Sequence, residues 1–520
     1  SAKSASAASA ASAASAANDT VDEDGKVNGI MYQEGLPLVD EGDYTFSIFC
    51  DDSSESGEFI MLDEFKKQTN VDVDLKIYPY ETATERLNLD LNSGDYADVI
   101  GGWTLSDNAI LTYGVNQGVF IPLEDYFEKY CPNISAILDL PGVREKMTAP
   151  DGHIYTIPYV CGDTTVGYSP YINTKWLENV GMSMPTTTDE FEAVLKAFKE
   201  QDANGNGDAS DEIPFSTDPN NKHIEAMAGY FGLPMNKLGI AIQDEKVVYG
   251  GVSNTYREFL SWFHKLYADG LVDVELYTQD SSTWEGKGNQ DLYGVSIAYG
   301  SNEFTGIPAA EERGDFDSMP VLNTDKGGIW LRDTEGFSVY RTQAVITNKA
   351  EHPEIICRWF DNAFALENGI GCNRGPVGVI VNKEDDGYHA IDTTTLSEED
   401  QEKYSWGNLW PQSLPKYLPV DFEFVEEHPM YDEKKATEEA YEANLTKEII
   451  PSYWIDLDKI DTFSDTNTAI KDFFEQQQAQ FVCGELDIDN DADWQAYVDG
   501  MYSLGLEDWV ATQGIEEIAK

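Results

Sequence analysis

One short stretch of the chain spaces oxygen-bearing side chains as a calcium-binding loop does. Asp202, Asn204 and Asn206 alternate with small residues, and Gly207 occupies the sixth position. Alternate side chains of such a loop point toward the ion, and the glycine takes a tight turn that a Cβ would obstruct. The loop departs from the EF-hand pattern at position 12, which is Ile213. The predicted Ca²⁺ ligands are Asp202, Asn204, Asn206, Asp208, Asp211 and Glu212.

A generic turn in an acidic protein is the alternative interpretation of this loop. If calcium binds there, we expect a structural role, because no base or nucleophile neighbours the loop in the sequence. A second run of alternating acids, residues 487–493, has Ala492 at its sixth position and no closing glutamate. Acids are favoured at helix N-termini, so we interpret this run as helix-terminal, with Asp493 as the N-cap.

The common catalytic motifs are absent from the sequence. It contains no Gly-x-Ser-x-Gly, no His-Glu-x-x-His and no P-loop, and its six histidines are dispersed. A glycoside hydrolase needs only two carboxylates beside a groove, so the 95 acidic residues leave that activity open. An oligopeptide receptor is a further alternative, which would need charged groups to pair with the peptide termini. We favour a binding protein that is not an enzyme.

The charge balance restricts the possible partners. Against 34 Lys and Arg the chain has 95 Asp and Glu, which gives a net charge of −61. Nucleic acids and anionic membrane surfaces would be repelled, so we expect no nucleic-acid partner and a neutral ligand. The 520 residues suffice for two substantial domains. The six cysteines have no zinc-ligand spacing and are expected to be buried free thiols, and no apolar run could cross a bilayer.

Alternating apolar residues predict the first elements of an α/β domain. Strand patterns begin at Tyr44, Val71 and Ala97, and helical patterns cover residues 59–69 and 81–91 between them. This β-α-β-α-β order predicts a parallel sheet covered by helices. Ligands of such sheets bind at the carboxyl ends of the strands, where Trp103 follows the third predicted strand.

Later segments extend the α/β pattern. We predict a hairpin over residues 151–158, a strand within 166–173, and a helix that begins at a capping box of Thr187 and Glu190 and leads into the calcium loop. The chain from Thr437 onward reads mostly as helix. Residues 1–17 contain only Ser, Ala and one Lys, so residues 1–40 are predicted to form a flexible tether.

Several motifs follow one another in a recognisable order along the chain. They lie at residues 151–158, 171–177, 202–214, 344–347, 358–361, 481–484 and 493–498. In order and spacing they resemble the family 1 extracellular solute-binding proteins of ABC importers, especially their large calcium-containing, oligosaccharide-binding lipoproteins. The resemblance covers roughly residues 40–520.

This resemblance implies a bilobal α/β fold of the periplasmic-binding-protein type, with a helical C-terminal part. Lobe 1 would comprise residues 41–165 and 338–405, and lobe 2 residues 166–337 and 406–520, with crossings near 161–168, 334–342 and 395–415. The family captures its ligand in an interlobe cleft and delivers it to ABC permease subunits. By analogy we expect an extracellular, Gram-positive-type surface monomer, tethered by a lipid on a residue upstream of Ser1.

An oligosaccharide site needs flat aromatic platforms and polar side chains that pair with hydroxyls. Rings on helical stripes, among them Trp176, Trp262 and Trp359, are expected to pack in the core, as are Trp494 and Trp509 in the terminal helices. Rings outside such stripes are the better candidates. The candidate ligand-binding residues are Trp103, Asp107, Asp163, Trp284, Tyr299, Asn302, Trp330, Trp406 and Trp410.

Overall fold

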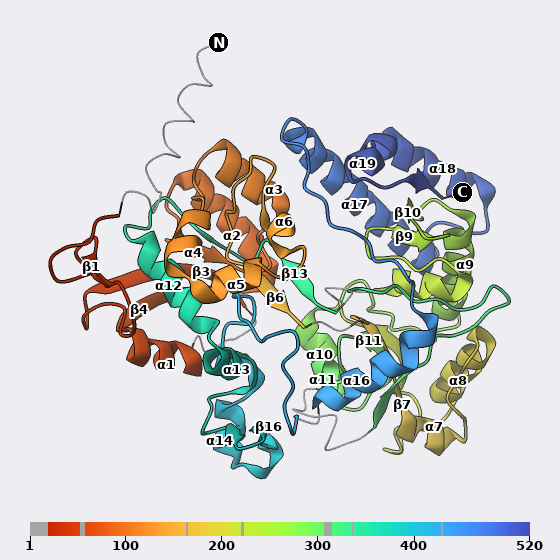
Figure 1. The fold of residues 1–520 in the computed structure, drawn as a ribbon. Helices are drawn as coiled ribbons and strands as arrows, with labels where there is room; N and C mark the ends of the chain where they lie inside the picture. Colours follow the sequence, from red (N-terminus) through yellow and green to blue (C-terminus); the bar gives the residue numbers. More distant parts are fainter. Residues whose placement is uncertain are drawn as a thin grey trace. The chain divides into compact units, whose positions relative to one another are not determined.

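The computed structural model describes residues 19–52, 58–162, 165–219, 223–305, 315–334, 336–427 and 430–519 (Figure 1). The chain divides into two compact units, each built from several chain segments. The first unit comprises Ser1–Asp163, Phe337–Glu427 and Trp454–Ile460, and the second comprises Thr164–Gly336, His428–Tyr453 and Asp461–Lys520. The α/β class predicted from the sequence describes this chain, whose two units are each discontinuous.

The first two division points fall inside the ranges expected from the sequence, but the third does not. It follows Glu427, beyond residues 395–415, because the segment before it packs into the first unit. Within that segment Trp410 is fully buried and stacks on Trp359, with ring centroids 5.7 Å apart. A further short segment, Trp454–Ile460, also belongs to the first unit.

The first unit is centred on a four-stranded sheet in the order β14-β5-β3-β4. Strands β5, β3 and β4 are parallel and β14 is antiparallel, which confirms the predicted parallel sheet. Helix α1 ends where Asn70 adopts a left-handed conformation, φ 59°. The bounds are β3 Tyr44–Asp51, α1 Ile60–Thr69, β4 Val71–Tyr78, α2 Tyr80–Ser93, β5 Val99–Gly101 and β14 Ala344–Ile346.

Short helices surround this sheet, and two strands, β6 and β13, pair antiparallel. The bounds are α3 Asp107–Ala109, α4 Glu124–Tyr130, α5 Pro132–Leu138, α6 Val143–Met147, β6 Tyr159–Cys161, β13 Ser338–Tyr340, α12 Pro353–Ala363, α13 Leu366–Arg374, β15 Val381–Glu384, β16 Gly387–Ala390, α14 Glu398–Lys403 and α15 Trp406–Leu409. A π-helical turn, Ile110–Asn116, follows α3. The predicted hairpin at residues 151–158 does not form, because this segment makes only an isolated bridge, from Thr156 to Val345.

The predicted tether is too long at its C-terminal end. Residues 1–18 lie outside the described part of the chain, but residues 19–40 fold onto the first unit through strands β1 Lys26–Val27 and β2 Met31–Tyr32. Val27, Met31 and Leu38 are buried in the core of this unit. These side chains distinguish residues 19–40 from the Ser/Ala-rich residues before them, which have no apolar side chain larger than alanine.

The second unit contains a four-stranded sheet in the order β12-β7-β11-β8 and a smaller sheet, β17-β10-β9. Its largest core cluster gathers residues from the sheet, from α8 and α9 and from the C-terminal helices. The bounds are β7 Ser169–Asn173, α7 Thr174–Val180, α8 Thr188–Glu200, β8 Ile213–Thr217, β9 Ile240–Gln243, β10 Lys246–Tyr249, α9 Asn254–Ala268, α10 Ser281–Asn289, β11 Tyr293–Ala298, α11 Asn302–Thr305, β12 Phe316–Ser318, α16 Met430–Tyr441, α17 Ile460–Cys483, α18 Asp491–Ser503, α19 Leu506–Thr512 and β17 Glu517–Ile518.

Two helix N-termini test the capping predictions. At α8 the Thr187 hydroxyl accepts a hydrogen bond from the Glu190 amide at 3.2 Å, as predicted, while the Glu190 carboxylate accepts from the amide of Thr186. At α18 the N-cap is Asn490, so the assignment of Asp493 was wrong. Asp493 lies inside the first turn and accepts instead from the Asp487 amide at 3.0 Å.

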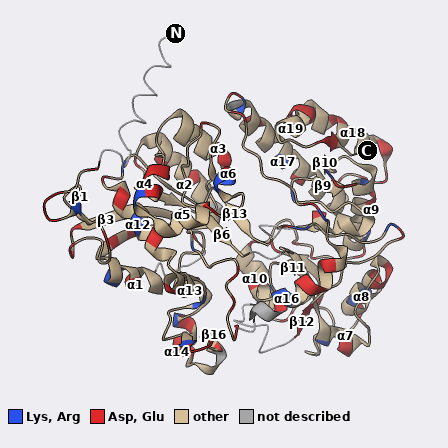
Figure 2. Cartoon of the chain, in the orientation of Figure 1, with Lys and Arg blue, Asp and Glu red and all other residues tan. Residues whose placement is uncertain are grey.

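Acidic residues are spread over the helices and loops of both units (Figure 2). All six cysteines lie in the described part of the chain and are free, and four of them are buried, whereas Cys161 is half-buried and Cys483 exposed. Within the described residues, no helix combines the length and the apolar character that a membrane span requires.

Candidate functional site

The predicted calcium loop follows helix α8 in the second unit and is closed by its own backbone. The Gly207 amide donates to Asp202 Oδ2 at 3.0 Å, and the Ala203 amide donates to Glu212 Oε1 at 2.9 Å. Gly205 and Gly207 have φ values of 75° and 94°, a region that residues with a Cβ rarely adopt. The acids at both ends of the loop are therefore held in place by main-chain donors.

The remaining oxygens of these two acids indicate what the loop would hold. Asp202 Oδ1 and Glu212 Oε2 are buried and have no hydrogen-bond partner. Burial also raises the pKa of Glu212. Unpartnered buried carboxylate oxygens are costly, and a cation would satisfy both of them. Because the donors are all oxygen atoms, the residues fit a hard ion such as Ca²⁺ better than a transition metal.

The middle of the loop is organised by side-chain amides. Asn206 Nδ2 donates to Asp211 Oδ2 at 2.7 Å, and Asn204 Nδ2 lies 3.3 Å from Asp211 Oδ1. Asp208 is exposed and accepts from the Ser210 amide at 3.1 Å, as in an Asx turn. The six predicted ligands thus share one loop, but Asp208 serves a local turn and the two asparagines direct their amide nitrogens at Asp211.

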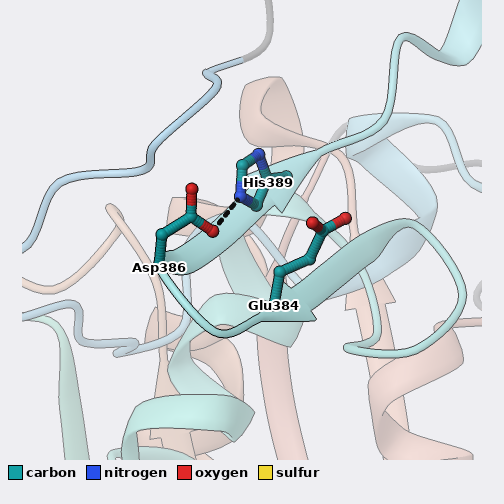
Figure 3. A group of neighbouring side chains, drawn as sticks. All are labelled: Glu384, Asp386 and His389. Carbon is teal, nitrogen blue, oxygen red and sulfur yellow. Dashed lines mark hydrogen bonds and ion pairs between the residues drawn. The ribbon is translucent and has the colours of Figure 1, made fainter.

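A separate cluster of potential metal ligands lies in the first unit, on the hairpin of β15 and β16 (Figure 3). His389 Nε2 pairs with Asp386 Oδ1 at 2.9 Å, and Glu384 completes the group. Hydrogen bonding to Asp386 raises the pKa of His389, which favours the imidazolium form that cannot bind a metal. Glu384 and Asp386 are exposed, so the cluster forms a surface ion pair and we assign no metal to it.

In the first unit, the structure places Trp103 on a loop directly after β5, as predicted. Its side chain is 47% exposed. Asp51, at the end of β3, accepts from the Trp103 amide at 3.0 Å and from the Thr104 amide at 2.5 Å. Gly102 allows this close approach, because its φ is 134° and a Cβ there would lie 2.2 Å from Asp51 Oδ1. The indole is thus presented by a loop that a buried carboxylate fixes.

Asp107 does not offer its carboxylate freely to a ligand. Arg341 donates to both of its oxygens, from Nε at 2.8 Å and from Nη2 at 2.5 Å. The same guanidinium lies over the ring of Trp454, 4.1 Å from its centroid. We did not predict Trp454 as a site residue. The signal that could have found it is a tryptophan outside any helical stripe, just after Pro451.

Trp406 lies at the surface, whereas Trp410 lies in the core. Trp406 is 49% exposed, and the Lys416 ammonium lies 5.0 Å from its ring centroid. Lys416 itself is buried, and burial lowers its pKa to about 8. Its ammonium donates to the Gln412 side-chain oxygen. Trp410 is fully buried, so its ring offers no surface to a ligand.

In the second unit, Tyr299 follows β11 and is 38% exposed. Its amide donates to Glu303 Oε2 at 2.9 Å, and burial raises the pKa of Glu303 to about 7. The Lys434 ammonium lies over the ring, 4.0 Å from its centroid. The Tyr168 ring meets Tyr299 edge-on at 6.0 Å. Asn302 is half-buried at the start of α11, one turn beyond the ring.

Three other candidates are not at an accessible surface or cannot be described. Trp284 lies in helix α10 rather than in a loop, is buried, and donates from Nε1 to Ser296 Oγ at 3.2 Å. Trp330 is buried between Tyr230 and Tyr441. Asp163 lies outside the described residues. Both tryptophans pack as core residues, and we do not include them in the site.

Comparisons with known proteins identify relatives of this chain. A family model described as bacterial extracellular solute-binding protein matches residues 52–369. The fructooligosaccharide ABC transporter substrate-binding protein FusA of Streptococcus pneumoniae is 32% identical over 374 residues, which cover 69% of this chain and 67% of FusA. Lipoprotein LipO of Bacillus subtilis is 28% identical over 280 residues, 52% of either chain.

Solved structures of FusA are also similar. The complex of FusA with kestose has a TM-score of 0.78 at 26% identity, covering 90% of this chain and 98% of FusA. A FusA EF-hand mutant in complex with fructo-nystose has a TM-score of 0.76 at 26% identity, with the same coverage. The fold similarity therefore extends over nearly the whole of that protein.

Proposed function

We propose, given that this chain belongs to the bacterial extracellular solute-binding proteins, that it captures a neutral oligosaccharide and delivers it to the permease of an ABC transporter. The first ligand class to test is the fructooligosaccharides, because FusA is named for them. The protein would act as a binding protein rather than as an enzyme, and as a monomer with the permease as its partner.

The observation that carries this proposal is a set of exposed aromatic rings on loops beyond strand ends. Trp103 in the first unit and Tyr299 in the second are each held by a carboxylate that accepts from the backbone of the ring's own loop. A sugar offers apolar C–H faces that stack on such rings, and rings fixed before binding lose little entropy on binding. Trp406 and Trp454 offer two further rings in the first unit on which a sugar could stack.

The ligand is expected to be uncharged because the cations beside these rings already have partners. Arg341 is paired with Asp107, Lys416 donates to Gln412, and Lys434 donates to main-chain carbonyls. An anionic sugar would also meet a chain of net charge −61. A uronate-containing oligosaccharide is therefore disfavoured on electrostatic grounds.

We further propose that the loop after α8 binds one structural calcium ion. The support is the pair of unpartnered buried oxygens on Asp202 and Glu212. Calcium supplies the positive charge that these oxygens lack, and Asp211 would join the coordination in place of its present hydrogen bonds to the amide groups of Asn204 and Asn206. The ion would hold the loop between α8 and β8 without taking part in ligand chemistry.

Calorimetric titration and thermal shift with kestose test the proposed function, with nystose, maltotriose, trigalacturonate and a tripeptide as alternatives. A neutral sugar at about 100 times its Kd should stabilise the protein by about 2.7 kcal/mol. Trp103→Ala and Tyr299→Ala, one in each unit, should each weaken binding without lowering the melting temperature. Binding of trigalacturonate or the tripeptide alone would reject the neutral-sugar proposal, and release of free fructose from kestose would reject the binder-only role.

A further inference from the structure

A buried lysine of the second unit lies against the exposed Tyr299 ring. Lys434, on helix α16, is 8% exposed. Its ammonium donates to the Tyr299 carbonyl at 2.7 Å and to the Gly167 carbonyl, and it lies 4.0 Å from the Tyr299 ring centroid. One side chain therefore contacts both the backbone and the aromatic face of the same residue.

The rest of the loop is fixed by two other side chains, Tyr171 and Glu433. The Tyr299 carbonyl also accepts from the buried Tyr171 hydroxyl at 3.0 Å. Two residues on, Glu433 accepts from the Ser301 amide at 3.2 Å and from the Ser301 hydroxyl at 2.9 Å. The main chain of residues 299–301 is therefore anchored independently of Lys434. What Lys434 adds is the contact with the ring, since a cation over an aromatic face attracts it.

The position of this charge needs an explanation, because burying an ammonium group costs several kcal/mol unless it is compensated. Burial lowers the pKa of Lys434 to about 8, against the opposing effect of the carboxylates that surround it. Those carboxylates are Glu303 on α11, Asp333 in the segment before the second division point, and Glu433 and Glu438 on α16 itself. A methionine or leucine would fill the space without this cost, but it would make none of the contacts that the ammonium makes with Gly167 and Tyr299.

We propose that Lys434 is a positioning residue that fixes the plane of the Tyr299 ring for stacking against a sugar. The ammonium lies over one face of the ring, and the Tyr168 ring lies at 73° to the Tyr299 plane with its centroid 6.0 Å away, so two neighbours restrict the orientation of the Tyr299 ring. This inference rests on the proposed function, in which Tyr299 contacts the ligand. It assigns to Lys434 an effect on affinity that acts through Tyr299 and not through direct contact.

A double-mutant cycle with kestose as the probe tests the coupling. Lys434→Met should weaken kestose binding by about tenfold, which lies between the values for an exposed and a fully desolvated cation–π contact. In a Tyr299→Ala background the same change should have almost no further effect. Lys434→Arg, which keeps a cation that can lie over the ring, should restore part of the loss. Lys326→Met, an exposed lysine paired with Glu258 in the same unit, is the matched control and should leave binding unchanged.

The pH dependence separates positioning from general stabilisation. The pKa of Lys434 is lower in the folded than in the unfolded chain, so the folded state loses its proton at a lower pH. The contribution of Lys434 to stability therefore rises with pH between about pH 8 and the ordinary lysine pKa. Kestose affinity should instead fall as pH rises through about 8, because the neutral amine attracts the ring less. Lys434→Met should abolish that fall.

Three outcomes would overturn the inference. Additive losses in the cycle would show that Lys434 does not act through Tyr299. An alkaline loss of affinity that persists in Lys434→Met would assign the titration to another group. If the wild-type protein binds no oligosaccharide, the proposed function fails. Hydrogen exchange without ligand then still tests whether the main chain of residues 299–301 is anchored independently of Lys434. Lys434→Met should leave the amides of residues 299 and 301 protected from exchange. Loss of that protection would show that Lys434 has only a structural role.

Discussion

Removing calcium should destabilise the second unit by an amount that its structure lets us estimate. Asp202 Oδ1 and Glu212 Oε2 are buried without partners, and each unsatisfied buried acceptor costs roughly 1–3 kcal/mol. An ion that satisfies both therefore contributes about 2–6 kcal/mol. In a unit of this size, 1 kcal/mol shifts the melting temperature by about 2–4 °C, so chelation should lower it by about 10 °C.

The assay is differential scanning calorimetry in EDTA and in Ca²⁺, with Mg²⁺ at equal concentration as the control. The control matters because any divalent cation screens a chain of net charge −61, whereas only a specific ion restores the full shift. Glu212→Gln sharpens the test, since it should stabilise the calcium-free protein by removing a buried charge and should weaken calcium binding.

The pH dependence of the calcium-free protein follows from the same residue. Burial raises the pKa of Glu212, so between its ordinary and its raised value the folded state binds more protons than the unfolded state. Stability of the calcium-free protein is then lost as pH rises through that window. Calcium affinity should change in the opposite direction, because the ion needs the carboxylate. An EDTA-insensitive melting temperature, together with no bound calcium in equilibrium dialysis, would refute the metal assignment.

Three further predictions concern the first unit. Gly102→Ala should lower the stability of the first unit by about 2 kcal/mol or more, because the residue has a positive φ and the new Cβ would lie 2.2 Å from Asp51 Oδ1. Sugar affinity should fall as well. An unchanged melting temperature would contradict this geometry. Trp410→Ala should cost about 3–5 kcal/mol as a large core truncation. Trp406→Ala should cost less than about 1 kcal/mol yet weaken sugar binding, because this ring is 49% exposed over Lys416. Chemical denaturation and calorimetric titration of the two tryptophan variants compare both effects.

Local sequence patterns predicted the secondary structure correctly where it depends on residues close in the sequence. The alternation at Tyr44 and Val71 predicted two strands of the first sheet, and the spacing after Thr187 predicted a helix with its N-terminal cap. The loop from Asp202 could be predicted as a calcium site because all of its predicted ligands lie within a few residues of one another. In each case the interactions that determine the structure are between residues close in the sequence, so the sequence pattern predicts them.

Predictions failed where a side chain depends on distant parts of the chain. Trp284, Trp330 and Trp410 lie outside regular helical stripes in the sequence, but each is buried in a hydrophobic cluster with residues from other elements. Asp107 looked like a free acid, but Arg341, 234 residues later, pairs with it. The third division point was misplaced for the same reason, because Trp410 packs on Trp359.

The sequence by itself determined the class of this protein: an acidic α/β chain with a calcium-type loop and motifs in the order of one family. Only the tertiary structure decided which aromatic rings are exposed and what holds them. The physical reason is that burial and ion pairing are properties of three-dimensional neighbours. Lys434 shows this most clearly, since nothing near it in the sequence indicates that its ammonium lies over the ring of Tyr299.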